Sequence, residues 1–150
     1  MTHAFTTDWS LFYQTLADRL NEGPVVVATV ISNPDEAICP AGAKLLVWGD
    51  AKTAGTLGSI PLEDIVQAAF EVMKTGLPQR MGLAGAQVWL ARWQGPDAIS
   101  TAQTLLSLLN SPHPGRLVIP LTGGQSPYVL EAGLSLRNLQ GQEAYIEDIP

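Results

Sequence analysis

A continuous apolar run from Val25 to Ile31 constrains the fold of this chain more than any other feature. The run consists largely of β-branched residues, which are typical of strands. Successive side chains of a strand point to opposite faces, so such a run predicts a strand that is buried on both faces. The sheet that contains this strand therefore needs a cover on each side.

Three helices are predicted from apolar residues that recur at the spacing of one helix face. The first is capped by Thr7 or Asp8, and its apolar face contains Trp9, Phe12, Tyr13, Leu16 and Leu20. The second begins at Pro61, and its apolar face contains Ile65, Ala68, Ala69, Val72 and Met73. The third is capped by Asp97, and its apolar face contains Ile99, Ala102, Leu105, Leu106 and Leu109.

Further strands are predicted over 44–48, 51–57, 87–93, 117–121 and 143–149. The first two of these are expected to pair as a hairpin-like return. In the segment 87–93, Trp89 and Trp93 are expected on one face, and Val88 and Leu90 on the other. The segment 129–139 is typical of either a weak helix or a ragged strand.

Helices that alternate with strands, without a linker or an internal repeat, predict one α/β domain over residues 1–150. We expect a mixed β-sheet packed by about three helices. Hydrophobic residues make up 46% of the chain and charged residues 15%, which leaves apolar surface for a homo-oligomer or another partner. Trp48 and Trp93 lie near predicted strand ends and are expected to be partly exposed at such a contact.

Charge and cysteine content limit the classes of partner and the compartment. The net charge is −6 and the eight Lys and Arg residues are scattered, so nucleic acid is not an expected partner. The amino terminus lacks a basic segment followed by an apolar one, and no apolar stretch approaches the roughly 18 residues of a membrane-spanning helix. Cys39 is the single cysteine, so no intramolecular disulfide is expected, and the cytoplasm is the simplest location.

No pattern in the sequence predicts catalysis or a metal site, and we expect a protein that is not an enzyme. Cys39 and the two histidines, His3 and His113, are too far apart in the sequence to predict a structural zinc site. No nucleophile elbow or phosphate-binding loop is present. Cys39 is either a displaced metal ligand or a small buried hydrophobe, and its neighbours Asp35 and Glu36 oppose thiolate formation.

The segment from Val25 to Glu63 resembles the amino-terminal domain of the XdhC/CoxI family, the accessory proteins that serve molybdenum hydroxylases. The resemblance rests on a first strand, a GAKMLV-like second strand and a glycine turn before a helix, at 27–30, 42–47 and 55–58. The family's glycine–cysteine motifs are degenerate, because Ser59-Ile60-Pro61 and Ala84-Gly85-Ala86 stand in their places. Longer family members add a carboxy-terminal Rossmann-type domain, which is not expected here because the dinucleotide-binding glycine fingerprint is missing.

This resemblance implies a non-catalytic accessory protein, similar to a molybdenum cofactor chaperone for a xanthine dehydrogenase or CO dehydrogenase type enzyme. The implied cofactor is molybdopterin, and the implied cofactor-binding residues are Gly42, Ala43, Lys44, Gly55, Gly58, Ser59 and Glu63. The glycines would bring backbone N–H groups close to an anionic phosphate, and Lys44 would supply a cation. Gly42, Lys44, Gly55 and Gly58 are then expected to converge on one concave surface near the start of the second helix.

Three alternatives stay open at the level of sequence, and the third is a small enzyme that acts through Cys39 or His113. In the first, the chain is a degenerate paralogue that acts as a protein-interaction or regulatory module without a cofactor. In the second, the glycines only make turns, and Lys44 is an exposed strand residue.

Overall fold

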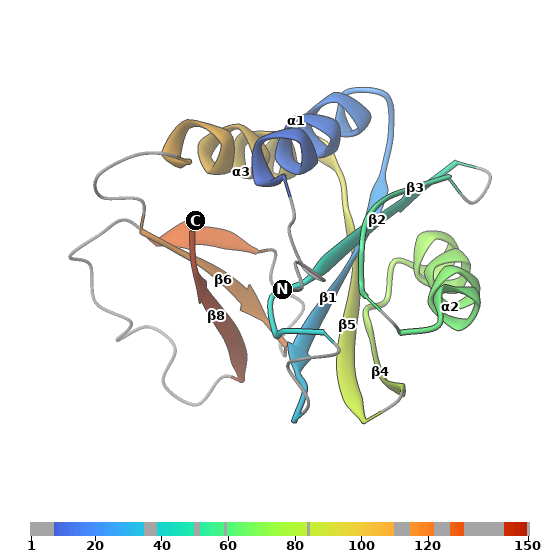
Figure 1. The fold of residues 1–150 in the computed structure, drawn as a ribbon. Helices are drawn as coiled ribbons and strands as arrows, with labels where there is room; N and C mark the ends of the chain where they lie inside the picture. The colour runs from blue at the N-terminus through green and yellow to red at the C-terminus, as the bar shows by residue number, and fades with distance from the viewer. Residues whose placement is uncertain are drawn as a thin grey trace.

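Two antiparallel β-sheets form the centre of the fold (Figure 1). The computed structural model describes residues 8–34, 39–49, 52–58, 60–83, 85–109, 115–121, 127–130 and 143–149. The strands are β1 (Val25–Ser32), β2 (Lys44–Trp48), β3 (Lys52–Gly55), β4 (Gln79–Leu83), β5 (Ala86–Trp93), β6 (Arg116–Pro120), β7 (Tyr128–Leu130) and β8 (Ala144–Asp148). The larger sheet has the strand order β3-β2-β1-β5-β4, and the smaller sheet has the order β7-β6-β8.

The expected α/β class with three helices is confirmed among the described residues. The strands differ from the expected single mixed sheet in two respects, because they form two sheets and every strand pair that the structure describes is antiparallel. Parallel neighbours need a crossover connection, usually a helix. Here α2 (Leu62–Thr75) joins strands at opposite edges of the large sheet, and α3 (Gly95–Leu108) joins strands of different sheets. Neither helix therefore connects two neighbouring strands.

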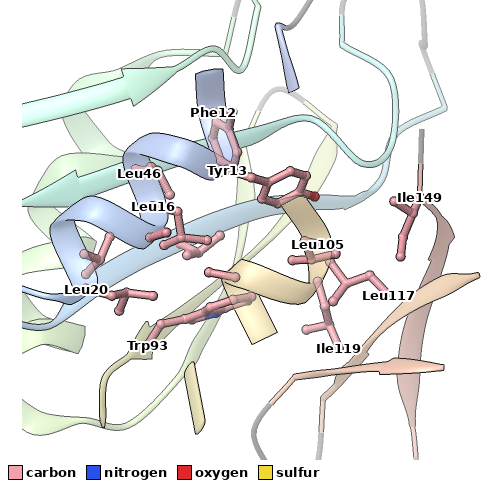
Figure 2. Close-up of a cluster of buried hydrophobic side chains, with 14 of the residues drawn as sticks. Phe12, Tyr13, Leu16, Leu20, Leu46, Trp93, Leu105, Leu117, Ile119 and Ile149 are labelled. Atoms are coloured by element: carbon pink, nitrogen blue, oxygen red, sulfur yellow. The ribbon is translucent and has the colours of Figure 1, made fainter. Parts of the chain in front are cut away.

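The helices cover both faces of the large sheet (Figure 1). α1 (Trp9–Leu20) and α3 lie side by side on one face, and α2 lies on the other. The small sheet lies on the same side as α1, because Leu117, Ile119 and Ile149 pack in one core cluster with that helix (Figure 2). Within the described part of the chain, each helix is too short or too polar to cross a bilayer.

β1 is buried on both faces, as its apolar run predicts. Val25 and Val27 pack in the cluster with α1 and α3, which we call the α1-side core. Val26, Ala28 and Val30 pack in the cluster under α2, which we call the α2-side core. The sheet therefore separates two cores, each built from alternate residues of its strands.

The predicted alternation along β5 is also confirmed. Trp89 and Trp93 lie in the α1-side core, and Val88 and Leu90 lie in the α2-side core. Trp93 is 4% exposed, so the expectation of a partly exposed ring is wrong for this residue. β5 is an inner strand between β1 and β4, and α3 covers its α1-side face.

Helix boundaries follow the predicted capping signals, with one difference. The Leu11 N–H donates to Asp8 Oδ1 at 3.0 Å, so Asp8 caps α1. α2 begins after Pro61, as expected. α3 begins at Gly95 and not after the predicted cap Asp97, because Pro96 is well suited to the first helical turn. Most of the segment 129–139 lies outside the described residues.

Candidate functional site

Lys44, the expected cation of the site, lies at the start of β2 with its side chain 1% exposed. It points to the α1 side of the sheet, where its Nζ lies 5.6 Å from the centroid of the Trp9 ring. Nζ donates to the Gly42 carbonyl oxygen at 3.0 Å and forms an ion pair with Oε1 of Glu147 in β8. The Lys44 ammonium therefore joins the large sheet to the small one.

Burial sets the electrostatics around this ion pair. Desolvation lowers the pKa of Lys44 below its ordinary value, and the charge of Glu147 acts in the opposite direction. Burial also raises the pKa of Tyr13 well above its ordinary value, with a smaller contribution in the same direction from Glu147. The surroundings thus favour a neutral Tyr13 phenol. The charges of the Lys44 ammonium and the Glu147 carboxylate compensate each other.

The two glycines nearest to Lys44 are needed for close packing within the protein. Gly42 has φ +98°, and a Cβ there would lie 3.2 Å from the Tyr145 hydroxyl oxygen and 3.7 Å from a carboxylate oxygen of Glu147. Gly55 has φ +96°, and a Cβ there would lie 2.5 Å from the Lys44 carbonyl oxygen. Both glycines therefore make room for other parts of the chain.

The other expected site residues do not lie around the Lys44 ammonium. Ala43 is buried in the α2-side core, as are Leu57 and Ile60, which flank the exposed Gly58. Glu63 is exposed in the first turn of α2, and Ser59 lies outside the described residues.

Lys44 thus lies on the α1 side of the large sheet, whereas Leu57 and Ile60 near Gly58 pack on the α2 side. The four residues therefore do not converge on one concave surface, because Lys44 faces the α1 side whereas the neighbours of Gly58 pack in the α2-side core.

The structure identifies Cys39 as a small buried residue. It is 0% exposed in the α2-side core, and burial raises the pKa of its thiol to about 11. Among the residues that the structure describes, no three His, Cys, Asp or Glu side chains form a group that could hold a metal ion. The described surroundings of Cys39 therefore do not fit a metal ligand, which requires the thiolate.

The comparison with protein families concerns the segment that contains these residues. The model of the XdhC and CoxI family matches residues 19–83. Over these residues, the chain is similar to the XdhC and CoxI family. The resemblance seen in the sequence is confirmed, and the matched segment extends from the end of α1 to the end of β4.

A similar fold occurs in the crystal structure of a xanthine dehydrogenase from Bacillus halodurans, with a TM-score of 0.64 and 17% sequence identity. The match covers 93% of this chain and 52% of that chain, so the present chain spans about half the length of the similar structure. At this identity the likeness shows the fold alone. A comparison with curated proteins found no match.

The residues of this matched segment do not fit an anionic cofactor at Lys44. A phosphate group would need an accessible cation and free N–H donors. Here the ammonium is buried against Glu147, and that carboxylate also borders Gly42. An anion beside Gly42 would meet the negative charge of Glu147, and the Lys44 ammonium is already paired with that carboxylate.

Sequence reasoning missed the residues that determine the environment of Lys44, which are Glu147, Tyr145 and Tyr13. A signal was available, because a lysine in an otherwise apolar strand needs a buried partner of opposite charge. The predicted last strand is acidic and contains Glu143, Glu147 and Asp148 as candidates. The choice among them depends on how the two sheets are aligned.

Proposed function

We propose that this chain is a non-catalytic accessory protein of a molybdenum hydroxylase of the xanthine dehydrogenase or CO dehydrogenase type. In this proposal it binds the enzyme as a protein-interaction module and does not itself hold the cofactor. The match of residues 19–83 to the XdhC and CoxI family supports the accessory role. The geometry at Lys44 favours the interaction module over the cofactor chaperone.

The proposal that the chain does not hold the cofactor rests on the burial of the Lys44–Glu147 pair. A buried charge is compensated by a partner, and removing that partner is costly. Lys44 is 1% exposed, and its Nζ is committed to Glu147 and to the Gly42 carbonyl group. Binding an anionic pterin at this position would require the two sheets to separate.

The second candidate is a chaperone that holds the molybdenum cofactor through Gly42, Ala43, Lys44, Gly55, Gly58, Ser59 and Glu63. It is favoured by the family match, which covers all of these positions. It differs from the first candidate in one measurable property, because the isolated chain would carry a pterin.

The test is recovery of the tagged chain from its native organism after chemical cross-linking. We expect mass spectrometry to identify a molybdenum hydroxylase in the recovered material, with molybdenum and pterin in the enzyme fraction. The chain purified on its own should contain neither. Pterin bound to the isolated chain would favour the second candidate, and the absence of a hydroxylase from cross-linked material would contradict the accessory role.

We further propose that the protein is a cytoplasmic homo-oligomer that assembles through an apolar flank of α2, formed by Leu62, Val66 and Phe70. These residues follow each other at intervals of one helical turn. Leu62 is 39% exposed and Phe70 is 45% exposed, which is unusual for large apolar side chains on one helix face. A second copy that packs against the same flank would bury both.

A further inference from the structure

The outer side of α2 carries opposite charges at its two ends. Glu63 lies in the first turn of the helix and Lys74 in the last, and both side chains are exposed. Neither forms an ion pair with another residue that the structure describes. At a rise of about 1.5 Å per residue, their Cα atoms lie about 16 Å apart along the helix axis, so the two side chains cannot pair within one copy. Each charge is therefore open to a second molecule.

Both charges border the apolar flank of Leu62, Val66 and Phe70. At 3.6 residues per turn, Glu63 and Lys74 lie about 60° and 80° from Val66 around the helix, on the same side as Phe70. Leu62 is 39% exposed and Phe70 is 45% exposed, so the flank is not covered by the described residues. α2 lies on the face of the large sheet opposite α1 and α3 (Figure 1). The flank and the two charges form one accessible surface, which we call the α2 surface.

The α2 surface is complementary to itself when two helices pack antiparallel. The midpoint of Val66 and Phe70 and the midpoint of Glu63 and Lys74 differ by only about half a residue along the helix, which is less than about 1 Å. The overlap that places Val66 against Phe70 of a second copy therefore also brings Glu63 close to Lys74 of that copy.

The symmetry of such a pair makes this contact occur twice. A two-fold axis perpendicular to both helices keeps the same edge of each helix on the same side of the contact, so Glu63 meets Lys74 at each end. Antiparallel helices also bring opposite ends of the two helix dipoles together. Parallel helices would place equal charges at the same level and would form neither ion pair.

We propose that two copies of this chain form a closed dimer through antiparallel α2 helices, in which Glu63 of each copy pairs with Lys74 of the other. This dimer rests on the proposed assembly through the flank of α2, and it adds the orientation and the residues that select it. The apolar flank supplies the buried area. Exposed ion pairs add little affinity, and here they discriminate against other orientations.

Charge reversal tests the orientation. Glu63→Lys and Lys74→Glu each replace both ion pairs by like charges, so each variant should dimerise about tenfold more weakly than the wild type. In an equal mixture of the two variants, the heterodimer joins opposite charges at both ends. With one variant labelled with nitrogen-15, native mass spectrometry separates the three dimers by mass. We expect more heterodimer than the half share that random pairing gives.

Asp64→Lys is the matched control for Glu63→Lys. Asp64 is an exposed acid of the same helical turn, and it lies about 160° from Val66, outside the α2 surface. Its substitution makes the same change in net charge at the same end of the helix dipole. A mixture of Asp64→Lys with Lys74→Glu should contain no excess of heterodimer.

The wild type gives a second readout that does not depend on the folding of a variant. A zero-length carbodiimide cross-link joins a carboxylate to an amine only when the two groups are in contact, and Glu63 and Lys74 of one copy are too far apart for it. We expect the cross-linked dimer to yield a peptide pair that joins Glu63 to Lys74.

The results that would overturn this dimer are distinguishable from failure of the assembly itself. A wild type that is monomeric at micromolar concentration would contradict both the dimer and the proposed assembly through the flank of α2. A dimeric wild type would contradict only the antiparallel arrangement, if the folded charge variants pair at random or if the link from Glu63 to Lys74 is absent.

Discussion

Cys39 is a buried thiol of the α2-side core, and burial governs its chemistry. Its pKa is raised from 9.0 to about 11 because the thiolate would lose its hydration inside the protein. At the scale of single residues, the surrounding core converts the one cysteine of the chain into a small hydrophobic side chain.

The raised pKa of Cys39 predicts a pH dependence of stability. The thiol ionises first in the unfolded chain, so its contribution is complete below pH 9.0 and is lost as the pH rises through about 11. We expect the free energy of unfolding of the wild type to fall over this interval relative to that of Cys39→Ala, in which the titration is absent. Urea titrations of both proteins at several pH values measure the difference. Parallel curves for the two proteins would contradict a shifted thiol pKa.

Gly55 decides how closely the end of β3 approaches α1 and β2. Its φ of +96° and the position of the absent Cβ, 2.9 Å from Phe12 Cε1, leave no room for a side chain. We expect Gly55→Ala to lower the free energy of unfolding by about 1–3 kcal/mol, because strain in the backbone adds to the steric clash. Denaturant titration measures this change.

Gly23→Ala is the matched control for Gly55→Ala, since a Cβ at Gly23 would meet no atom within 4 Å. It should change the free energy of unfolding by less than the Gly55 variant. Equal effects of the two substitutions would show that close packing at Gly55 is unimportant.

The apolar flank of α2 predicts an effect on assembly. Phe70→Asp places a charge in the flank, and Gln67→Asp places the same charge on an exposed position outside it. We expect sedimentation to show an oligomer for the wild type and for Gln67→Asp, and a monomer for Phe70→Asp, because a buried unpaired carboxylate would oppose the contact. A monomeric wild type, or an unaffected Phe70→Asp, would contradict this interface.

At the scale of the whole molecule, the Lys44–Glu147 pair connects strands that are far apart in the sequence and belong to different sheets. The surrounding apolar contacts include Leu117, Ile119 and Ile149 from the side of the small sheet (Figure 2). Because the pair is desolvated, its two charges depend on each other. The packing of the small sheet against the large one therefore depends on this ion pair as well as on apolar contacts.

Substitution of this pair predicts strong coupling. Lys44→Met should lower the free energy of unfolding by about 3–5 kcal/mol, since it leaves the Glu147 carboxylate without its partner. The double variant with Glu147→Leu should recover most of this loss, because no unpaired charge remains. Urea titration of the two single variants and the double variant measures the coupling.

Arg80→Met provides a surface control for the same experiment. Arg80 and Glu143 are 39% and 54% exposed, and removal of such a pair is expected to cost less than about 1 kcal/mol. Additive losses in the Lys44 and Glu147 double variant would show that the buried pair is not a coupled unit.

The sequence by itself determined the local structure of this protein. The apolar run of β1, the alternation along β5 and the spacing of apolar residues in the helices each follow from the periodicity of one element. β4 was missed, because Gln79, Arg80 and Gly82 interrupt the apolar alternation that marks a strand. The family resemblance was also readable, since it rests on a continuous segment.

The tertiary structure alone decided what the expected site residues do. Lys44 was read as an accessible cation, yet the face of β2 on which it lies and the position of Glu147 make it one half of a buried ion pair. The contact of the Arg19 guanidinium with the Trp48 ring likewise joins separate elements that meet only in the folded chain. Periodicity specifies which face a side chain occupies, whereas its partner depends on contacts between distant segments, and these arise only when the sheets and helices pack.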